Sequence, residues 1–172
     1  VLAKLCLLKS LNQNIPFQKI NIGRNENGSP LLFINQSPIT NISYSISHKR
    51  DYVFCAATDK LSIGVDVEQV IKKLTRVKSY YISEAEDQVI SEAIKNDDVL
   101  VYYAKLWSAK ESLVKLLKKY SLMEMLKKAQ LIAINDDELA LNIQTESSHL
   151  KIKAKSYLYN GFVFSFVLNK ER

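Results

Sequence analysis

The sequence predicts an α+β fold, because segments with strand periodicity and segments with helix periodicity occupy separate parts of the chain. Short β-rich runs gather before residue 70, helical segments fill residues 72 to 119, and further strand-like runs close the chain. We expect two similar halves with a pseudo-two-fold relation, each a small antiparallel sheet packed with a long helix, although the sequence contains no internal repeat that by itself shows this relation. The predicted boundary near Val70 divides the chain into residues 1–70 and 71–172.

The first half should open with a helix and a turn. Leucines recur at helical spacing over Val1–Leu11, which predicts an amphipathic helix. Residues 25–30 read Asn-Glu-Asn-Gly-Ser-Pro, and this composition is typical of a loop. Within it Gly28 can adopt positive φ, and Pro30 should lead into a new extended run.

Three strands should complete the first half. Over Asn41–His48, apolar residues alternate with asparagine and serine, which predicts a strand with one solvated face. Tyr52–Ala57 and Ile63–Val67 are short runs of β-formers. We therefore expect an antiparallel meander in which the three strands follow one another.

The second half should consist of helices followed by a sheet. Lys72–Lys95 reads as helical, with Ser83 ahead of Glu84 and Glu86 in the pattern of a capping box. Val99 to Lys119 contains no Gly or Pro and should form the longest helix. Four strands should follow, with a turn at Asp136-Asp137 and a hairpin at Asn160-Gly161: Gln130–Ile134, Glu138–Ile143, Leu150–Tyr157 and Phe162–Leu168.

The composition is that of an ordinary soluble globular protein, with 47% hydrophobic and 24% charged residues and no apolar run long enough for a bilayer. Cys6 and Cys55 lie in apolar surroundings without the spacing of metal ligands, so we expect buried thiols and a reducing cytoplasm. The net charge of +6 favours acidic partners without choosing among them, and much of it fits solvated helix faces.

Two carboxylates end the strand that starts at Ile63. Strand alternation places Asp66 and Glu68 on the same face, and two like charges at this spacing favour a hard cation such as Mg²⁺. An isolated pair of this kind fits a solvated strand end at least as well. The context adds weight, because Gly64 allows another backbone to approach and the long helix carries a third carboxylate, Glu111.

Around Glu111 the long helix reads Trp-Ser-Ala-Lys-Glu-Ser-Leu-Val-Lys from Trp107 to Lys115. Trp107, Lys110, Glu111 and Lys115 recur at spacings of three and four, so one face should carry an aromatic ring, a carboxylate and two amines. A core tryptophan beside ordinary surface charges is the alternative interpretation of this segment taken alone.

In combination, these segments resemble the phosphopantetheinyl transferase superfamily, and in particular its surfactin-synthetase-activating type. In that family a Gly-Lys-Pro turn precedes a strand ending in Ser-His. A Gly-[Val/Ile]-Asp-[Ile/Val]-Glu strand follows, and then a Trp-x-x-Lys-Glu helix with a second lysine four residues after the glutamate. The resemblance extends over Leu2–Leu168, and its counterparts here are Gly28 and Pro30, Asn41–His48, Gly64–Glu68 and Trp107–Lys115.

The resemblance implies transfer of the phosphopantetheine arm of coenzyme A to a serine of an apo acyl or peptidyl carrier protein, with release of 3′,5′-ADP. It implies a monomer that needs Mg²⁺ and has no nucleic-acid or membrane partner. The implied metal ligands are Asp66, Glu68 and Glu111. The implied cofactor-binding residues are Gly28, Pro30, Ser47, His48, Lys110 and Lys115, and the implied catalytic residues are Glu111, Glu86 and Lys115, with Glu84 as the alternative to Glu86.

The chain departs from the family pattern at Ser29, where the family usually has lysine, and after Lys115, where the helix should continue through Tyr120 instead of reaching a glycine. Exposed Leu122 and Met123 would suit an acidic carrier helix.

Two other functions stay open on the sequence alone. A metal-dependent nuclease could use the same carboxylates, although Gln69 and Val70 follow Glu68 where such an enzyme usually has a lysine. A non-catalytic module that binds coenzyme A or a carrier protein would explain the departure at Ser29.

Overall fold

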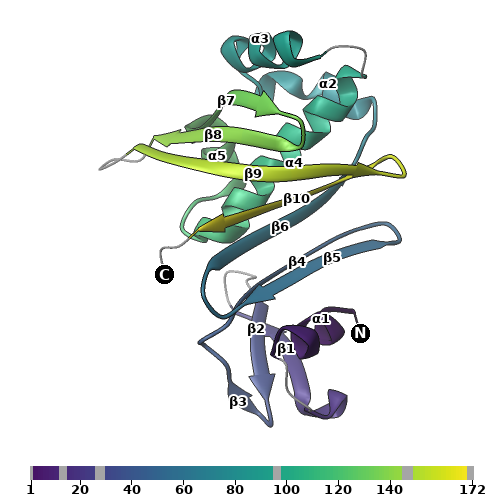
Figure 1. Cartoon of the computed structure of the whole chain (residues 1–172), viewed down its shortest axis with the longest axis vertical. Coiled ribbons are helices and arrows are strands. Elements are labelled where there is room, and N and C mark those ends of the chain that lie inside the picture. The colour runs from purple at the N-terminus through teal and green to yellow at the C-terminus, as the bar shows by residue number, and fades with distance from the viewer. Residues whose placement is uncertain (1, 12–14, 26–29, 95–97, 145–148, 170–172) are drawn as a thin grey trace.

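The computed structural model describes residues 2–11, 15–25, 30–94, 98–144 and 149–169. The predicted α+β class is confirmed, since helices and antiparallel sheets occupy separate stretches of the chain (Figure 1). The described strands form three sheets, with the orders β1-β2-β3, β4-β5 and β6-β10-β9-β8-β7. Gly28 and Ser29, and with them the predicted turn, lie outside the described residues.

The N-terminal elements surround a small core. Helix α1 (Leu2–Leu11) was predicted, and β2 (Pro30–Ile34) confirms the extended run after the turn. The sequence did not predict the partners of β2, which are β1 (Ile20–Arg24) on one edge and β3 (Ser37–Pro38) on the other. The buried hydrophobic residues of this region are Ile20, Leu32, Ile42 and Tyr44.

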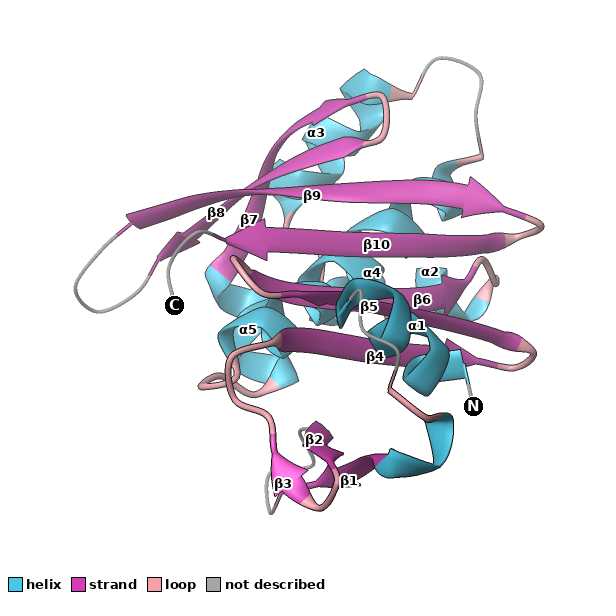
Figure 2. Ribbon diagram, turned by 60° about the horizontal axis from the view of Figure 1, so that its bottom comes forward, coloured by secondary structure: helices cyan, strands magenta, loops and turns pink. Residues whose placement is uncertain are grey.

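Helix α1 packs on strand β5 (Tyr52–Thr58), as Figure 2 shows. Cys6 of the helix and Cys55 of the strand are half-buried thiols, which confirms thiols over a disulfide. Burial and the neighbouring Cys6 thiol raise the pKa of Cys55 to about 12. This contact joins the first helix to the hairpin of β4 (Ser43–Lys49) and β5.

The predicted three-stranded meander is wrong in one respect. Strands β4 and β5 pair as expected, but β6 (Ser62–Gln69) pairs with β10, with Asp66 opposite Ser165. Six consecutive residues of β6, from 63 to 68, are buried, so this strand is covered on both faces. It is nevertheless the terminal strand of the five-stranded sheet, and its pairing partner comes from the end of the chain.

The open edge of β6 is covered by the serine side chains of β4. Ser43 Oγ accepts from the backbone N–H of Ile63 at 3.0 Å, and Ser45 Oγ accepts from that of Val65 at 3.0 Å. Ser45 and Ser47 are only 4% and 7% exposed. The prediction of a solvated serine face is therefore wrong, because Ser43 and Ser45 satisfy backbone donors of the neighbouring strand and Ser47 donates to the Asp66 carboxylate.

The C-terminal elements follow the predicted order. Ser83 forms the capping box with Glu86, and the Asp98 side chain caps the long helix. Asn160 and Gly161 both have positive φ, as a tight hairpin requires. The elements are α2 (Lys73–Arg76), η2 (Lys78–Tyr80), α3 (Glu84–Ala93), α4 (Val99–Leu117), α5 (Leu122–Lys128), β7 (Ala129–Asn135), β8 (Glu138–Gln144), β9 (His149–Tyr159) and β10 (Phe162–Asn169).

The long helix ends earlier than expected. Helix α4 stops at Leu117, and Lys118 adopts a left-handed conformation with φ 55°. The predicted continuation through Tyr120 is therefore wrong, and a separate helix, α5, begins after the cap at Ser121. Leu122 packs against the core, whereas Met123 is 52% exposed as predicted.

Helix α4 lies directly against β6 at Gly64. A Cβ atom added there would collide with the carbonyl oxygen of Ser112 and would lie 2.8 Å from the backbone nitrogen of Leu116. Glycine therefore sets the separation of helix and strand, as the sequence indicated. This close contact brings the carboxylates of β6 next to those of α4.

The two halves of the described chain differ in size, and their pseudo-two-fold relation stays a prediction, as does the boundary at residue 70. Strand β6, placed in the first half by that boundary, lies in the five-stranded sheet of the second. None of the helices in the described part of the chain combines the length and the hydropathy needed to span a bilayer.

Candidate active site between strand β6 and helix α4

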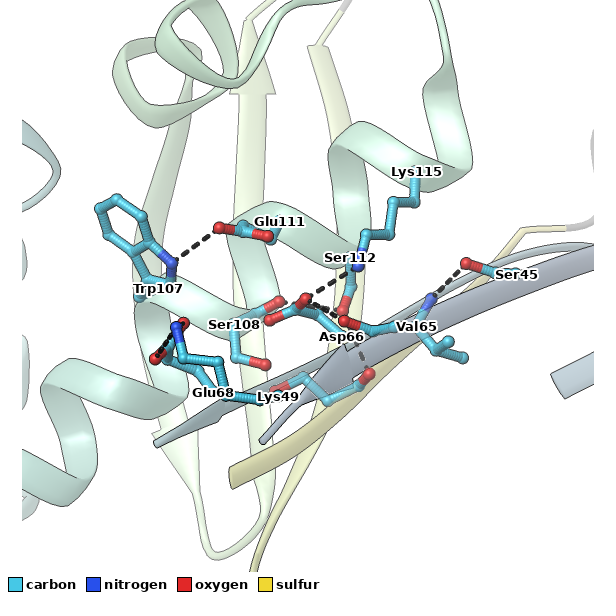
Figure 3. A network of polar contacts seen from close by, with 12 residues as sticks. Ser45, Lys49, Val65, Asp66, Glu68, Trp107, Ser108, Glu111, Ser112 and Lys115 are labelled. Atoms are coloured by element: carbon cyan, nitrogen blue, oxygen red, sulfur yellow. Dashed lines mark hydrogen bonds and ion pairs between the residues drawn. The ribbon is translucent and has the colours of Figure 1, made fainter. Parts of the chain in front are cut away.

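Asp66 is the centre of the polar network on β6. Its side chain is 3% exposed, and its Oδ1 accepts hydrogen bonds from Ser47 Oγ and from Lys115 Nζ, each at 2.8 Å. Figure 3 shows Lys115 reaching from α4 to this carboxylate. Asp66 Oδ2 is buried and has no hydrogen-bond partner in the described structure, so one carboxylate oxygen is available for a ligand.

Glu111 of α4 supplies the second carboxyl of the site. Trp107 Nε1 donates to Glu111 Oε1 at 2.8 Å and so orients the side chain (Figure 3). Burial, followed by the adjacent Asp66 carboxylate, raises the pKa of Glu111 to about 7, against the lowering effects of Lys115 and Trp107. The two carboxyls therefore resist carrying two negative charges together near neutral pH.

Glu68 lies on the same face of β6 but has a different partner. Lys49 Nζ of β4 contacts both carboxylate oxygens, at 2.8 Å from Oε1 and 2.9 Å from Oε2. Of the three predicted metal ligands, the structure thus brings Asp66 and Glu111 together and pairs Glu68 with a lysine. Among the described residues, no three His, Cys, Asp or Glu side chains already converge as a metal site.

Sequence reasoning missed Lys49, although the pattern contained a signal for it. Ser47 and Lys49 are two residues apart on β4, as Asp66 and Glu68 are on β6. Each side chain of the first pair contacts one of the second. Two alternating polar pairs on neighbouring strands would have predicted the contact, had β4 been placed beside β6.

Lys110 and Glu86 form a buried ion pair away from this site. Lys110 Nζ lies 2.8 Å from Glu86 Oε1, and it donates to the carbonyl oxygens of Tyr81 at 2.7 Å and Leu126 at 3.1 Å. The two side chains are 0% and 3% exposed. All three ammonium protons thus have acceptors inside the protein, and the structure does not bring Lys110 to the carboxyl pair, so its role in cofactor binding stays a prediction.

Both carboxylate oxygens of Glu86 also accept hydrogen bonds inside the protein. Its Oε2 accepts from the backbone N–H of Ser83 at 2.8 Å, and its Oε1 accepts from that of Leu131 at 2.9 Å. The structure therefore does not bring Glu86 to the predicted catalytic group. Its contacts cap α3 and join that helix to β7, and Glu84 is an exposed residue of the same first turn.

A pocket of about 640 Å³ opens beside the carboxyl pair, and Lys115 connects the two because it lines the pocket and bonds Asp66. Its described lining contains the basic residues Arg24, Lys115 and Lys118 and also His48, but no aspartate or glutamate. Pro30 and His48 line the pocket, whereas the Ser47 hydroxyl contacts Asp66, and the predicted cofactor contacts of all three stay predictions. Such a lining favours an anionic ligand.

Two family models match this chain. One, described as the 4'-phosphopantetheinyl transferase superfamily, matches residues 62–167, and one described as 4'-phosphopantetheinyl transferase, N-terminal, matches residues 1–60. The chain belongs to the 4'-phosphopantetheinyl transferase superfamily. The segment of this chain that matches the first model contains the carboxylates of β6 and α4. The segment that matches the second contains strands β1 to β5. Compared with individual curated proteins, the chain has no significant match.

Membership in the superfamily implies phosphopantetheine transfer with coenzyme A and a carrier protein as partners in general. The surfactin-synthetase-activating type stays a prediction. The two matches meet between residues 60 and 62, one strand before the predicted boundary, which agrees with the position of β6 in the C-terminal sheet.

Proposed function

We propose that this phosphopantetheinyl transferase moves the phosphopantetheine arm from coenzyme A to the serine hydroxyl of an apo acyl or peptidyl carrier protein and releases 3′,5′-ADP. The basic pocket beside the carboxyl pair carries the proposal. Its described lining has Arg24, Lys115 and Lys118 and no acidic side chain, which suits the phosphates of coenzyme A. Lys115 then links the bound phosphates to Asp66.

The residues at Asp66 fit a divalent cation. The unpartnered Asp66 Oδ2 and the neighbouring Glu111 carboxyl form an oxygen-rich site whose like charges a cation would balance. Mg²⁺ bound there would neutralise charge on the pyrophosphate oxygens as the phosphorus–oxygen bond breaks. Glu68 would be the third ligand, in exchange for its ion pair with Lys49.

Three side chains of the protein would bind the phosphates or orient Asp66. Lys115, 30% exposed, is free on its pocket side to donate to a phosphate oxygen and so to stabilise the departing 3′,5′-ADP. His48 on β4 also lines the pocket and can donate to a phosphate. Ser47 orients Asp66 by its hydrogen bond.

Of the two candidate bases, Glu111 lies at the site and Glu86 does not. Glu111 is oriented by Trp107 beside Asp66, so it is placed to accept the proton of the carrier serine. We assign it that role, with an intervening water as the other route for the proton.

The test is the intact mass of an apo acyl carrier protein incubated with this chain, coenzyme A and Mg²⁺. We expect a gain of one phosphopantetheine group, lost with Asp66→Asn and with Glu111→Ala. Asp87→Asn is the matched control, because Asp87 pairs with Lys78 outside the site at 2.6 Å. Coenzyme A binding without any mass gain on several carriers would favour the binding module instead, and Mg²⁺-dependent cleavage of plain DNA would favour the nuclease.

A further inference from the structure

Lys118 occupies a backbone position that disfavours lysine. Its N–H donates to the carbonyl oxygen of Val114 and closes helix α4, with φ 55° and ψ −11°. This is the left-handed region, and glycine is the usual residue where a helix ends in this way, because any Cβ atom is strained there. The helix cap therefore gives no reason for a lysine at this position.

Lys118 lines the pocket beside the carboxyl pair. Lys118 is exposed and lines the 640 Å³ pocket together with Lys115, which lies three residues earlier on the same helix. The next residue, Lys119, has its ammonium over the Tyr120 ring at 4.9 Å from the centroid and is not part of the described lining. Lys118 thus lines the pocket itself, whereas the ammonium of Lys119 is held over the ring of Tyr120, another residue of the lining.

The position of Lys118 in the pocket indicates which phosphate of coenzyme A would lie near its ammonium. Lys115 bonds Asp66, so this end of α4 borders the carboxyl pair where the proposed reaction takes place. Arg24, at the end of β1, lines the pocket from the N-terminal sheet instead. A phosphate beside the C-terminus of a helix meets the negative end of the helix dipole, and a cation at this point would offset that repulsion.

We propose that Lys118 contacts the pyrophosphate of coenzyme A and that the left-handed end of α4 holds its ammonium in the pocket. The assignment rests on the proposed function and adds to it a binding residue that does not belong to the carboxyl network. The alternative role for the side chain is to balance the helix dipole alone.

Lys118→Gly separates these roles, because it relieves the backbone while removing the cation. We expect its dissociation constant for coenzyme A, measured by calorimetry on the purified chain, to rise about tenfold, the usual size for one charged hydrogen bond. The melting temperature should stay level or rise by up to about 3 °C. Lys118→Arg should retain most of the affinity, and Lys119→Ala, with the same loss of charge, should bind within about twofold of the wild type.

The probe 3′-dephospho-coenzyme A tells which phosphate is held. If Lys118 contacts the pyrophosphate, Lys118→Gly loses the same factor toward both compounds. A loss confined to coenzyme A would assign the contact to the 3′-phosphate and overturn the proposal, and unchanged affinity for both would leave only the dipole role. If the wild type bound neither compound, the proposed function itself would fail.

Discussion

The C-terminal part of the molecule buries twenty-one hydrophobic residues in its described core, between α4 and a five-stranded sheet, whereas the N-terminal part buries four. Both parts contribute to the pocket: Lys115 and Lys118 come from the first, Arg24 and Pro30 from the second. Local stability follows buried apolar contacts, so the N-terminal wall should open at lower free energy than the C-terminal wall. The reacting groups, Asp66 and Glu111, lie on the more stable side.

The contact between the two parts is also unusual, because β4 is bonded to β6 by serine hydroxyls instead of by backbone–backbone hydrogen bonds. Ser43 and Ser45 each satisfy one N–H of β6, and Ser47 bonds Asp66. The same strand that shields the edge of β6 thus orients its carboxylate. The site therefore depends on the large core for position and on a few polar contacts for its second wall.

The largest effect should come from Gly64→Ala in the C-terminal packing. The new Cβ would meet the backbone of Ser112 and Leu116, which cannot move without displacing α4. We expect a loss of at least about 4 kcal/mol in the free energy of unfolding, measured in urea. Gly23→Ala is the N-terminal counterpart, and its Cβ would lie 3.5 Å from a ring carbon of Phe33, so the change should stay within about 1 kcal/mol. Equal effects at both glycines would contradict the difference in packing.

The two helix lysines should separate stability from activity. Lys110→Met leaves the buried Glu86 carboxylate without its cation, and we expect a loss of about 3–5 kcal/mol of folding free energy. Lys115→Met also leaves a buried carboxylate, Asp66, without its cation, but Ser47 still donates to it and Lys115 is 30% exposed, so we expect a smaller loss of stability than with Lys110→Met and a strong reduction in carrier modification. Urea unfolding and the carrier mass assay on the same samples check both statements. A Lys110→Met variant that stayed stable but lost activity would indicate that Lys110 acts in the active site.

Ser45→Ala should weaken the contact between strands β4 and β6. The substitution leaves the buried N–H of Val65 without an acceptor, which costs about 1–3 kcal/mol. Ser43→Ala acts on a half-buried contact to Ile63, where water can replace the hydroxyl, so its effect should be smaller. Hydrogen exchange at the amide of Val65 reports the local change. If that amide stayed protected in Ser45→Ala, another group would satisfy it.

The smallest effect concerns pH. The folded-state pKa of Glu111, about 7, lies above its ordinary value of 4.5, so the folded chain holds a proton that the unfolded chain releases. The stability from this group is complete below about pH 4.5 and is lost as pH rises through 7. We expect the difference in melting temperature between wild type and Glu111→Gln to change over that window. Mg²⁺ should reduce the dependence, and a wild-type profile parallel to that of the variant would contradict it.

The sequence alone determined the elements whose causes are local. Ser83 and Asp98 begin helices by capping backbone N–H groups within three residues, and Asn160-Gly161 forms its hairpin because both residues accept positive φ. Alternation along β6 likewise places Asp66 and Glu68 on one face, because side chains two residues apart on a strand point the same way.

Tertiary structure decided what depends on residues far apart in the chain. Strand β6 could have paired with β5, but it pairs with β10, about a hundred residues later, as the terminal strand of the large sheet, where α4 packs closely on it at Gly64. Lys110 and Lys115 look alike in the sequence, and only the packing of α4 sends one to Glu86 and the other to Asp66. A side chain's spacing on a helix follows from the backbone period, whereas its partner is set by whichever element covers that face.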